Sequence, residues 1–438
     1  MSWEVLPPRS ETSLALAPSG THWEVAPRGH RYAVRIIGMA IELVLLAHTS
    51  LRAAARCFLV WNQGVWPSLW TIRFWLLRLG LYELRRAKPW ASDWGFIVDA
   101  SIAVGQHKAL VILGARLGSM RERGFNLGHQ QVVTLGLSIL SKCDGEAVHA
   151  QLEAAARAVG VPRAVVSDRG GDVPKGMRLF REAHPEVAWI YDLTHGLARL
   201  LEKELGKAAW WGEFLTQVGQ CRHGCQQTAW SHLLPPTQRT KARWFNLEPL
   251  IGWGRRVLAY GRREGLQEGK FAQLFGWLSG FEEHLQEAAQ MVEMIQSVCA
   301  RIKRQGLSAE QVEWCANRIE AIARTERTQA FGGRVLEFVR EQAALARPGE
   351  KLLGSSDVIE SMFGKYKGAV ERSPLKAITE MVLLVAAWTS PRTPELIREA
   401  METVGTAEVG AWFEANGEPS LLAKRRAALR DDKGTQPV

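Results

Sequence analysis

Three acidic residues, far apart in the chain, stand where a predicted strand ends or a predicted helix begins: Asp99, Asp168 and Glu360. Asp99 and Asp168 each follow a run of β-forming residues, so both carboxylates are expected at one edge of a sheet. Carboxylates on separate rigid elements are the ligands that Mg²⁺ prefers, with Mn²⁺ as a substitute. Two such ions can hold the attacking and leaving oxygens of a phosphodiester in line. The three acids are therefore the predicted catalytic and metal-binding residues.

Other acids compete for these roles. Asp93 and Asp172 lie near the first two positions, and Asp357 lies one helical turn before Glu360. Aspartate commonly ends a strand as a turn residue, so one acid alone is weak evidence. Asp99 and Asp168 are preferred because each directly follows its β-forming run.

Asp192 and His195, in the segment Asp-Leu-Thr-His, allow two interpretations. As a metal ligand, His195 would be unusual beside Mg²⁺, which prefers oxygen. As a buried histidine bonded to Asp192, it would brace the floor of the site, as residues behind metal ligands often do. The structural brace is the favoured interpretation.

The order of elements predicts an α/β fold with a mixed sheet. Strands are expected at 94–100, 107–115, 131–140, 164–166 and 187–191, with helices between the later ones. Three consecutive strands followed by alternating helices and strands resemble the RNase H-like fold. The predicted catalytic core covers 91–206 and 351–395, interrupted by an all-helical insertion at 207–350, and a basic tail follows at 396–438.

Residues 1–30 are predicted to be mobile, and residues 31–90 to form three helices resembling a helix-turn-helix. The third helix carries Thr71, Arg73 and Arg78, which are predicted to contact DNA. A plain helical bundle is the alternative.

The chain has 438 residues and a formal charge of +10, which suits a polyanionic partner such as nucleic acid. Its first residues lack the pattern of a signal peptide. The longest apolar stretch, 36–48, contains Glu42 and is too short to cross a bilayer, so no membrane association is expected. Six scattered cysteines suggest reduced thiols and a cytoplasmic, nucleoid-associated protein.

The combination of motifs resembles the DDE transposases that have an all-helical insertion before the final Glu, including bacterial insertion-sequence, mutator-like and hAT-like transposases. Asp99, Asp168 and Glu360 match their acids, and residues 192–195 match their Asp/Cys-x-x-His motif. Residues 356–367 (Ser-Asp-Val-Ile-Glu-Ser-Met-Phe-Gly-Lys-Tyr-Lys) are similar to their final helix, with Asp357 where Asn is usual. The resemblance implies double-stranded DNA as partner, at element ends and target, and a homo-oligomer for synapsis.

Two other functions remain open at this stage. One is an RNase H-like nuclease without transposition, and the other is a domesticated transposase relative that binds DNA without cutting it.

Further DNA contacts are predicted at Lys365 and Lys367 on the last helix, and at Lys241, Arg243 and Trp244 in the insertion. Core packing is the alternative for Trp244. A zinc site is a minor alternative, with candidate ligands Cys221, His223, Cys225 and His232.

Overall fold

The computed structural model describes residues 23–61, 66–104, 107–237, 247–370, 377–417 and 419–429. The predicted contacts at Lys241, Arg243 and Trp244 lie outside these residues, as do most of the N-terminal residues predicted to be mobile.

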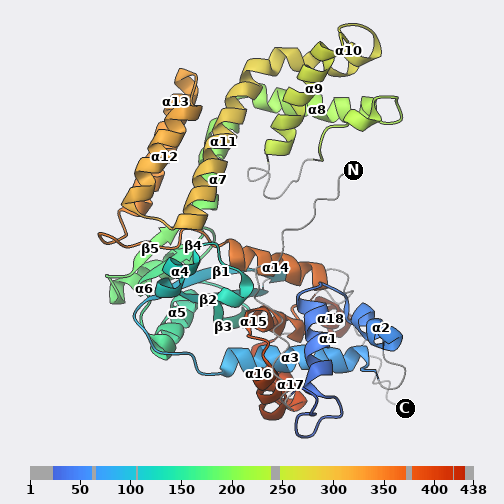
Figure 1. Cartoon of the computed structure of the whole chain (residues 1–438), viewed down its shortest axis with the longest axis vertical. Helices are drawn as coiled ribbons and strands as arrows, with labels where there is room; N and C mark the ends of the chain where they lie inside the picture. Colours follow the sequence, from blue (N-terminus) through green and yellow to red (C-terminus); the bar gives the residue numbers. More distant parts are fainter. Residues whose placement is uncertain are drawn as a thin grey trace, which may run out of the picture.

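The centre of the molecule is a five-stranded sheet with the strand order β3-β2-β1-β4-β5 (Figure 1). β1 pairs antiparallel with β2, and β2 with β3, whereas β4 and β5 add parallel strands on the other side of β1. This is the mixed topology of an RNase H-like fold, which confirms the predicted fold class. The strands are β1 (Trp94–Val104), β2 (His107–Arg116), β3 (Val133–Leu140), β4 (Ala164–Ser167) and β5 (Ala188–Tyr191).

Side chains alternate across the sheet, and each face has its own apolar core. Phe96 and Val98 join a cluster with α5 and α6, whereas Ile97 joins the larger cluster on the opposite face. The helices that follow strands in this part of the chain are α4 (Leu117–Arg123), α5 (Gly145–Val159) and α6 (Val173–Ala183), with a short 3₁₀ turn η1 (His129–Gln131).

The named elements in the described part of the predicted insertion are all helices, and they rise from the sheet as an arm together with the preceding α7 in Figure 1. α7, α11, α12 and α13 stand together next to the sheet, and α8, α9 and α10 lie at the far end. The helices are α7 (Leu193–Leu205), α8 (Ala209–Cys225), α9 (Glu248–Arg263), α10 (Gly269–Phe275), α11 (Glu282–Gln305), α12 (Ala309–Ile322) and α13 (Glu326–Ala343), with 3₁₀ turns η2 (Ser231–Leu233) and η4 (Gly276–Phe281).

Helices from the N-terminal and C-terminal parts of the described chain pack together, which the sequence did not predict. α3 contacts not only α1 and α2 but also α15, α16, α17 and β3. The predicted N-terminal helical domain is thus part of a larger unit, and 394–416 is folded rather than a tail. The helices are α1 (Val34–Leu45), α2 (Leu51–Trp61), α3 (Leu69–Arg85), α14 (Asp357–Val370), η5 (Glu380–Leu383), α15 (Leu384–Thr389), α16 (Pro394–Thr403), α17 (Thr406–Asn416) and α18 (Leu421–Ala428).

Within the described residues, none of the helices combines the length and the apolar character needed to cross a membrane.

Candidate active site at the sheet edge

The pairing of β1, β4 and β5 brings three aspartates to one edge of the sheet. Val98 of β1 is the partner of Ser167 of β4, and Ser167 is the partner of Tyr191 of β5. The residue that follows each of these partners is an acid: Asp99, Asp168 and Asp192. Because the three strands are parallel and in this register, the acids lie next to one another, Asp168 and Asp192 directly after the ends of β4 and β5. Asp99 lies inside β1, which continues to Val104 along β2 and does not end near Asp99 as the sequence predicts.

Asp99 is half-buried, and its Oδ1 accepts a hydrogen bond from the backbone N–H of Ala100 at 2.6 Å. Burial, followed by the negative charge of Asp168, raises the pKa of Asp99 to about 7; Glu360 adds to this rise. The three acids thus repel one another electrostatically, and the group as a whole favours an added positive charge.

Asp168 is held by the turn that follows it. Its Oδ1 accepts a hydrogen bond from the N–H of Gly170 at 3.2 Å. A Cβ atom at residue 170 would lie 2.8 Å from Oδ2 of Asp168, so a larger residue there would displace the carboxylate. The intervening Arg169 places its guanidinium over the rings of Trp189 and Tyr191, 5.2 and 4.9 Å from their centroids.

Asp192 has a different role from the other two strand-end aspartates. It is fully buried, and its Oδ2 accepts hydrogen bonds from the N–H and the hydroxyl of Ser356, at 2.6 and 2.9 Å. Ser356 directly precedes α14, so Asp192 ties the end of β5 to the start of the helix that carries Glu360. This places Glu360 beside the sheet edge although the insertion separates it from β5 in the sequence.

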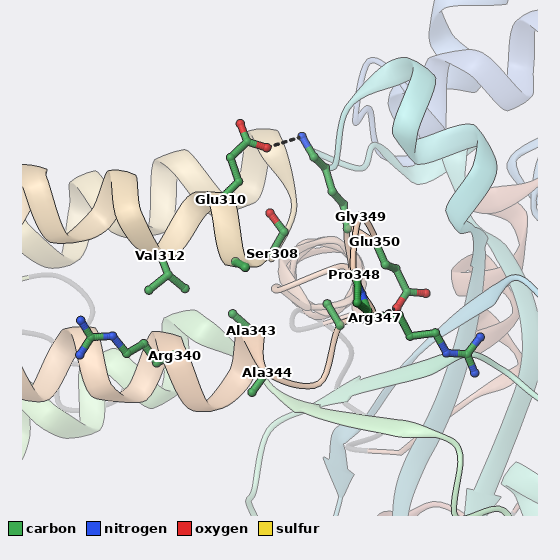
Figure 2. Close-up of a pocket in the computed structure, with 13 residues that line it drawn as sticks. Ser308, Glu310, Val312, Arg340, Ala343, Ala344, Arg347, Pro348, Gly349 and Glu350 are labelled. Carbon is green, nitrogen blue, oxygen red and sulfur yellow. Dashed lines mark hydrogen bonds and ion pairs between the residues drawn. The ribbon is translucent and has the colours of Figure 1, made fainter.

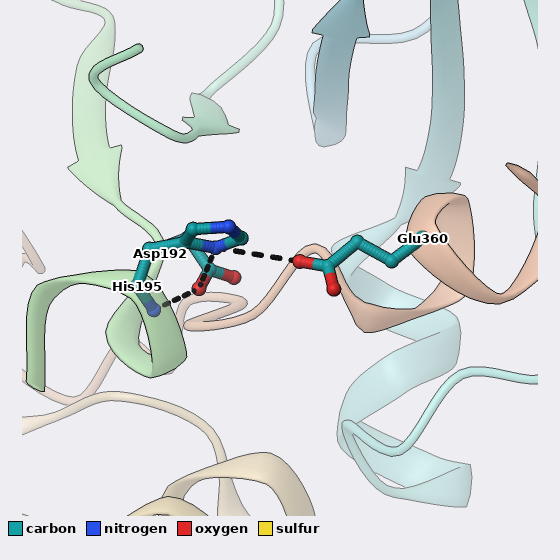
Figure 3. A group of neighbouring side chains, drawn as sticks. All are labelled: Asp192, His195 and Glu360. Atoms are coloured by element: carbon teal, nitrogen blue, oxygen red, sulfur yellow. Dashed lines mark hydrogen bonds and ion pairs between the residues drawn. The ribbon is translucent and has the colours of Figure 1, made fainter. Parts of the chain in front are cut away.

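His195 connects Asp192 to Glu360 (Figure 3). Its N–H and Nδ1 lie 2.8 and 3.0 Å from Oδ1 of Asp192, and Nδ1 lies 3.3 Å from Oε1 of Glu360. Burial lowers the pKa of His195, but its hydrogen bond to Asp192 and the charges of Asp192, Glu360 and Asp168 outweigh burial and raise the pKa to about 9. Because Asp192 engages Nδ1 of His195, the geometry supports the brace interpretation, which stays a prediction. The histidine reaches Glu360 directly, a contact that the sequence did not predict.

Ligand atoms of Asp192, His195 and Glu360 lie within 4.8 Å of one another, the one such group of three in the described part of the chain. Asp99 and Asp168 are not members of this group, but Glu360 lies close enough to Asp99 to raise its pKa, after burial and Asp168.

Asp357, the first residue of α14, is engaged by the insertion. Lys303 of α11 places Nζ 2.5 Å from its Oδ2, and the hydroxyl of Thr194 donates to Oδ1 at 3.4 Å. Asp357 is therefore not a competing catalytic acid in this structure but a contact that fixes the start of the helix one turn before Glu360. No sequence signal pointed to Lys303.

The other acids and the zinc candidates lie elsewhere. Asp93 precedes β1, at the opposite edge of the sheet, where it pairs with Arg116. Asp172 is exposed before α6. The zinc interpretation is wrong for the described residues: Cys225 is buried, with Sγ donating to the carbonyl of Trp230 at 2.9 Å, whereas His223 is exposed.

The predicted DNA contacts fall into two groups. On α14, Lys367 donates to the hydroxyl of Ser101 at 3.2 Å, and Lys365 lies 3.3 Å from Nδ1 of His129. On α3, Arg73 pairs with a carboxylate and Arg78 binds two backbone carbonyls, while Thr71 bonds the capping Ser68. DNA contact by any of these residues stays a prediction.

A pocket of about 570 Å³ lies between α12, the end of α13 and the chain that leads to α14 (Figure 2). It includes the buried Ser308, whose hydroxyl lacks a hydrogen-bond partner, and Glu350, which pairs with Arg163. Its lining contains none of the acids at the sheet edge, so we assign the chemistry to that edge and not to this pocket.

Comparison with known proteins adds little to this geometry. No protein-family model matches the chain, and no curated protein matches it. Among solved structures, the Drosophila P element transposase strand transfer complex is similar with a TM-score of 0.40 and 12% identity, over 85% of this chain and 93% of that chain. The geometry of the site is therefore the basis for assigning a function.

Proposed function

We propose that this protein cuts and joins DNA strands as a DDE transposase, with Asp99, Asp168 and Glu360 as its catalytic, metal-binding acids. The observation that supports the proposal is the register that sets Asp99 of β1 beside Asp168 of β4, together with the Asp192–Ser356 hydrogen bond that holds the start of α14, the helix of Glu360, at the end of β5.

The residues fit a pair of divalent cations, Mg²⁺ or Mn²⁺. The donors are carboxylate oxygens on separate rigid elements, and a cation would offset both the burial and the neighbouring negative charge of Asp168 that raise the pKa of Asp99. When bound, such ions supply charge neutralisation and Lewis-acid activation at the phosphate.

The remaining residues would hold this arrangement. His195 keeps a positive charge between Asp192 and Glu360, so that the Glu360 carboxylate stays turned toward the sheet edge. Lys303 and Thr194 would hold the start of α14 through Asp357. In the proposed reaction, water cleaves one P–O bond to free a 3′-hydroxyl, and this hydroxyl then attacks a phosphodiester of a second DNA, forming one P–O bond and breaking another.

The natural partners under this proposal are element ends and target DNA, brought together by a homo-oligomer, in the cytoplasm at the nucleoid. The net charge of +10 supports a polyanionic partner.

The test uses the full chain with Mg²⁺ or Mn²⁺, a supercoiled plasmid for cleavage, and a duplex with a free 3′-hydroxyl for strand transfer. Asp99→Asn, Asp168→Asn and Glu360→Gln should each lower cleavage by on the order of 10³-fold, as expected for loss of a charge-stabilising group at a reacting centre. Asp93→Asn, at the opposite edge, is the matched control and should cleave normally.

The outcomes separate the alternatives. Cleavage without joining would favour an RNase H-like nuclease, and DNA binding without cleavage would favour a domesticated relative. A variant of Asp99, Asp168 or Glu360 that cleaves within about tenfold of the wild type would remove that residue from the site.

A further inference from the structure

The outer surface of α14 carries positive charge next to Glu360. One side of the helix is buried through apolar residues that include Ile359, Met362 and Phe363. The other side is open to solvent and includes Glu360, Ser361, Gly364 and Lys367. This solvent-exposed side of α14 runs away from the candidate active site, and no other element among the described residues covers it.

A basic cluster, consisting of His48, His129 and Lys365, borders this open side. Lys365 Nζ lies 3.3 Å from Nδ1 of His129, and Nε2 of His129 lies 3.1 Å from the hydroxyl of Ser361. His48, from the loop after α1, is close enough for Lys365 to lower its pKa, after burial. The cluster thus joins three separate segments of the chain at the side of α14.

The charges around the cluster are positive. Burial first, and then Lys365, His48 and Arg392, lower the pKa of His129 to about 4. Arg392 is balanced by Glu42, with Nε 2.6 Å from Oε1, but in the described structure Lys365 has no carboxylate partner. A half-buried cation without a counter-charge favours an anion at this position.

We propose that the open side of α14 and its basic cluster bind the phosphodiester backbone of a DNA strand that continues past Glu360. Lys365 would donate to a phosphate oxygen, and the Ser361 hydroxyl, whose oxygen lies 3.1 Å from Nε2 of His129, offers a second donor. Continuity with the acids argues for this occupant, because a strand cut at the sheet edge must leave along a neighbouring surface. The inference rests on the proposed function only for the choice of DNA as the polyanion.

Gly364 provides a direct test. A Cβ atom there would meet nothing within 4 Å, so Gly364→Leu adds a side chain to the open surface without an internal clash. Gly333 on α13 is equally open, which makes Gly333→Leu the matched control. Lys365→Gln removes the charge, and Lys207→Gln, at an exposed lysine between α7 and α8, is its control.

Binding of the full-length protein to a labelled DNA duplex is measured by fluorescence anisotropy in EDTA, over a series of salt concentrations. We expect Gly364→Leu and Lys365→Gln to raise the Kd by about tenfold, and Lys365→Gln to reduce the slope of log K against log salt by about one. Both controls should bind as the wild type does. Thermal melting of each variant checks that it folds.

Equal Kd values for Gly364→Leu and Gly333→Leu, with an unchanged salt slope for Lys365→Gln, would overturn the proposal. If Gly364→Leu does not fold, the salt slope of Lys365→Gln decides alone. A wild-type chain that binds no DNA would overturn both this proposal and the proposed function. The binding assay contains no metal and requires no cleavage, and Asp93→Asn, at the opposite edge of the sheet, should bind normally, so a failure of catalysis is distinguishable from a failure of this surface.

Discussion

Helices α3 and α14 both carry basic residues that the sequence predicts to contact DNA, but in the folded protein these residues have different partners. On α3, Arg73 lies 3.0 Å from Glu380, and Arg78 donates to the backbone carbonyls of Met401 and Val404. On α14, Lys365 lies next to Nδ1 of His129 and Lys367 donates to the hydroxyl of Ser101, and neither lysine has a carboxylate partner among the residues that the structure describes. A basic side chain is available to a phosphate only when no acceptor within the chain already satisfies it.

A glycine in each helix shows the same difference. A Cβ atom at Gly80 of α3 would collide with the carbonyl oxygen of Leu383, so this glycine allows η5 to pack directly on the helix. A Cβ atom at Gly364 of α14 would meet nothing. α3 is held along its length by packing, whereas α14 is held at its start by Asp192, Ser356 and Asp357 and keeps one side open.

The largest expected effect is on stability and concerns Arg78. Arg78→Met leaves two carbonyls without their donor, which should lower the free energy of unfolding by roughly 2–6 kcal/mol, at about 1–3 kcal/mol for each unsatisfied group. Urea unfolding measures this change. Lys367→Gln on the open side of α14 should change stability by less than about 0.5 kcal/mol. Equal stability of the two variants would contradict the difference between the helices.

His195 and Asp99 should make the free energy of unfolding depend on pH when metal is removed by EDTA. The pKa of His195 rises from 6.5 to about 9, so its stabilising contribution is complete below its unfolded pKa and is lost as the pH rises through about 9. The pKa of Asp99 rises from 3.8 to about 7, so its contribution is likewise lost as the pH rises through about 7. We expect the free energy of unfolding to fall by roughly 1–3 kcal/mol between about pH 6 and about pH 9.

Two variants show which side chain causes each part of this pH dependence. Asp99→Asn should flatten the fall near pH 7, and His195→Gln should flatten it near pH 9. A fall that persists unchanged in both variants would place its origin outside the acid cluster.

A smaller effect is expected from the ion pair that anchors α14 to the insertion. Lys303→Met and Asp357→Asn should each lower cleavage by about tenfold, because each leaves its partner unpaired and loosens the turn before Glu360. The double variant should be no worse than either single one, since residues in direct contact are not additive. Cleavage lowered by about a hundredfold in the double variant would show that the two side chains act separately. Unchanged metal-free DNA binding distinguishes this positioning role from a loss of substrate contact.

The smallest effect is expected at Arg73, whose pair with Glu380 is only partly exposed. Arg73→Ala should lower the free energy of unfolding by about 1 kcal/mol or less, with DNA affinity unchanged. If it instead weakens DNA binding at least tenfold without loss of stability, α3 is a recognition helix, as the sequence predicts, and the comparison with α14 fails.

Local patterns in the sequence were sufficient to predict the five strands, because a run of β-forming residues is a local property. They placed Asp168 correctly after β4, but they missed the end of β1, which pairing with β2 extends past Asp99 to Val104. The helical insertion was predictable for the same reason, because the period of apolar residues distinguishes helix from strand. Glu360 was found through its resemblance to a family motif.

Contacts between segments that are distant in the sequence could not be predicted from it and are known only from the tertiary structure. Asp192 and Ser356 lie 164 residues apart, and no residue pattern in either segment predicts that the chain returns from the insertion to the end of β5. The enclosure of α3 likewise depends on 394–416 folding back onto it. An apolar period identifies one buried side of a helix, but long-range packing determines how much of the remaining surface is covered. For this reason, the arginines of α3 and the lysines of α14 look alike in the sequence and differ in the folded protein.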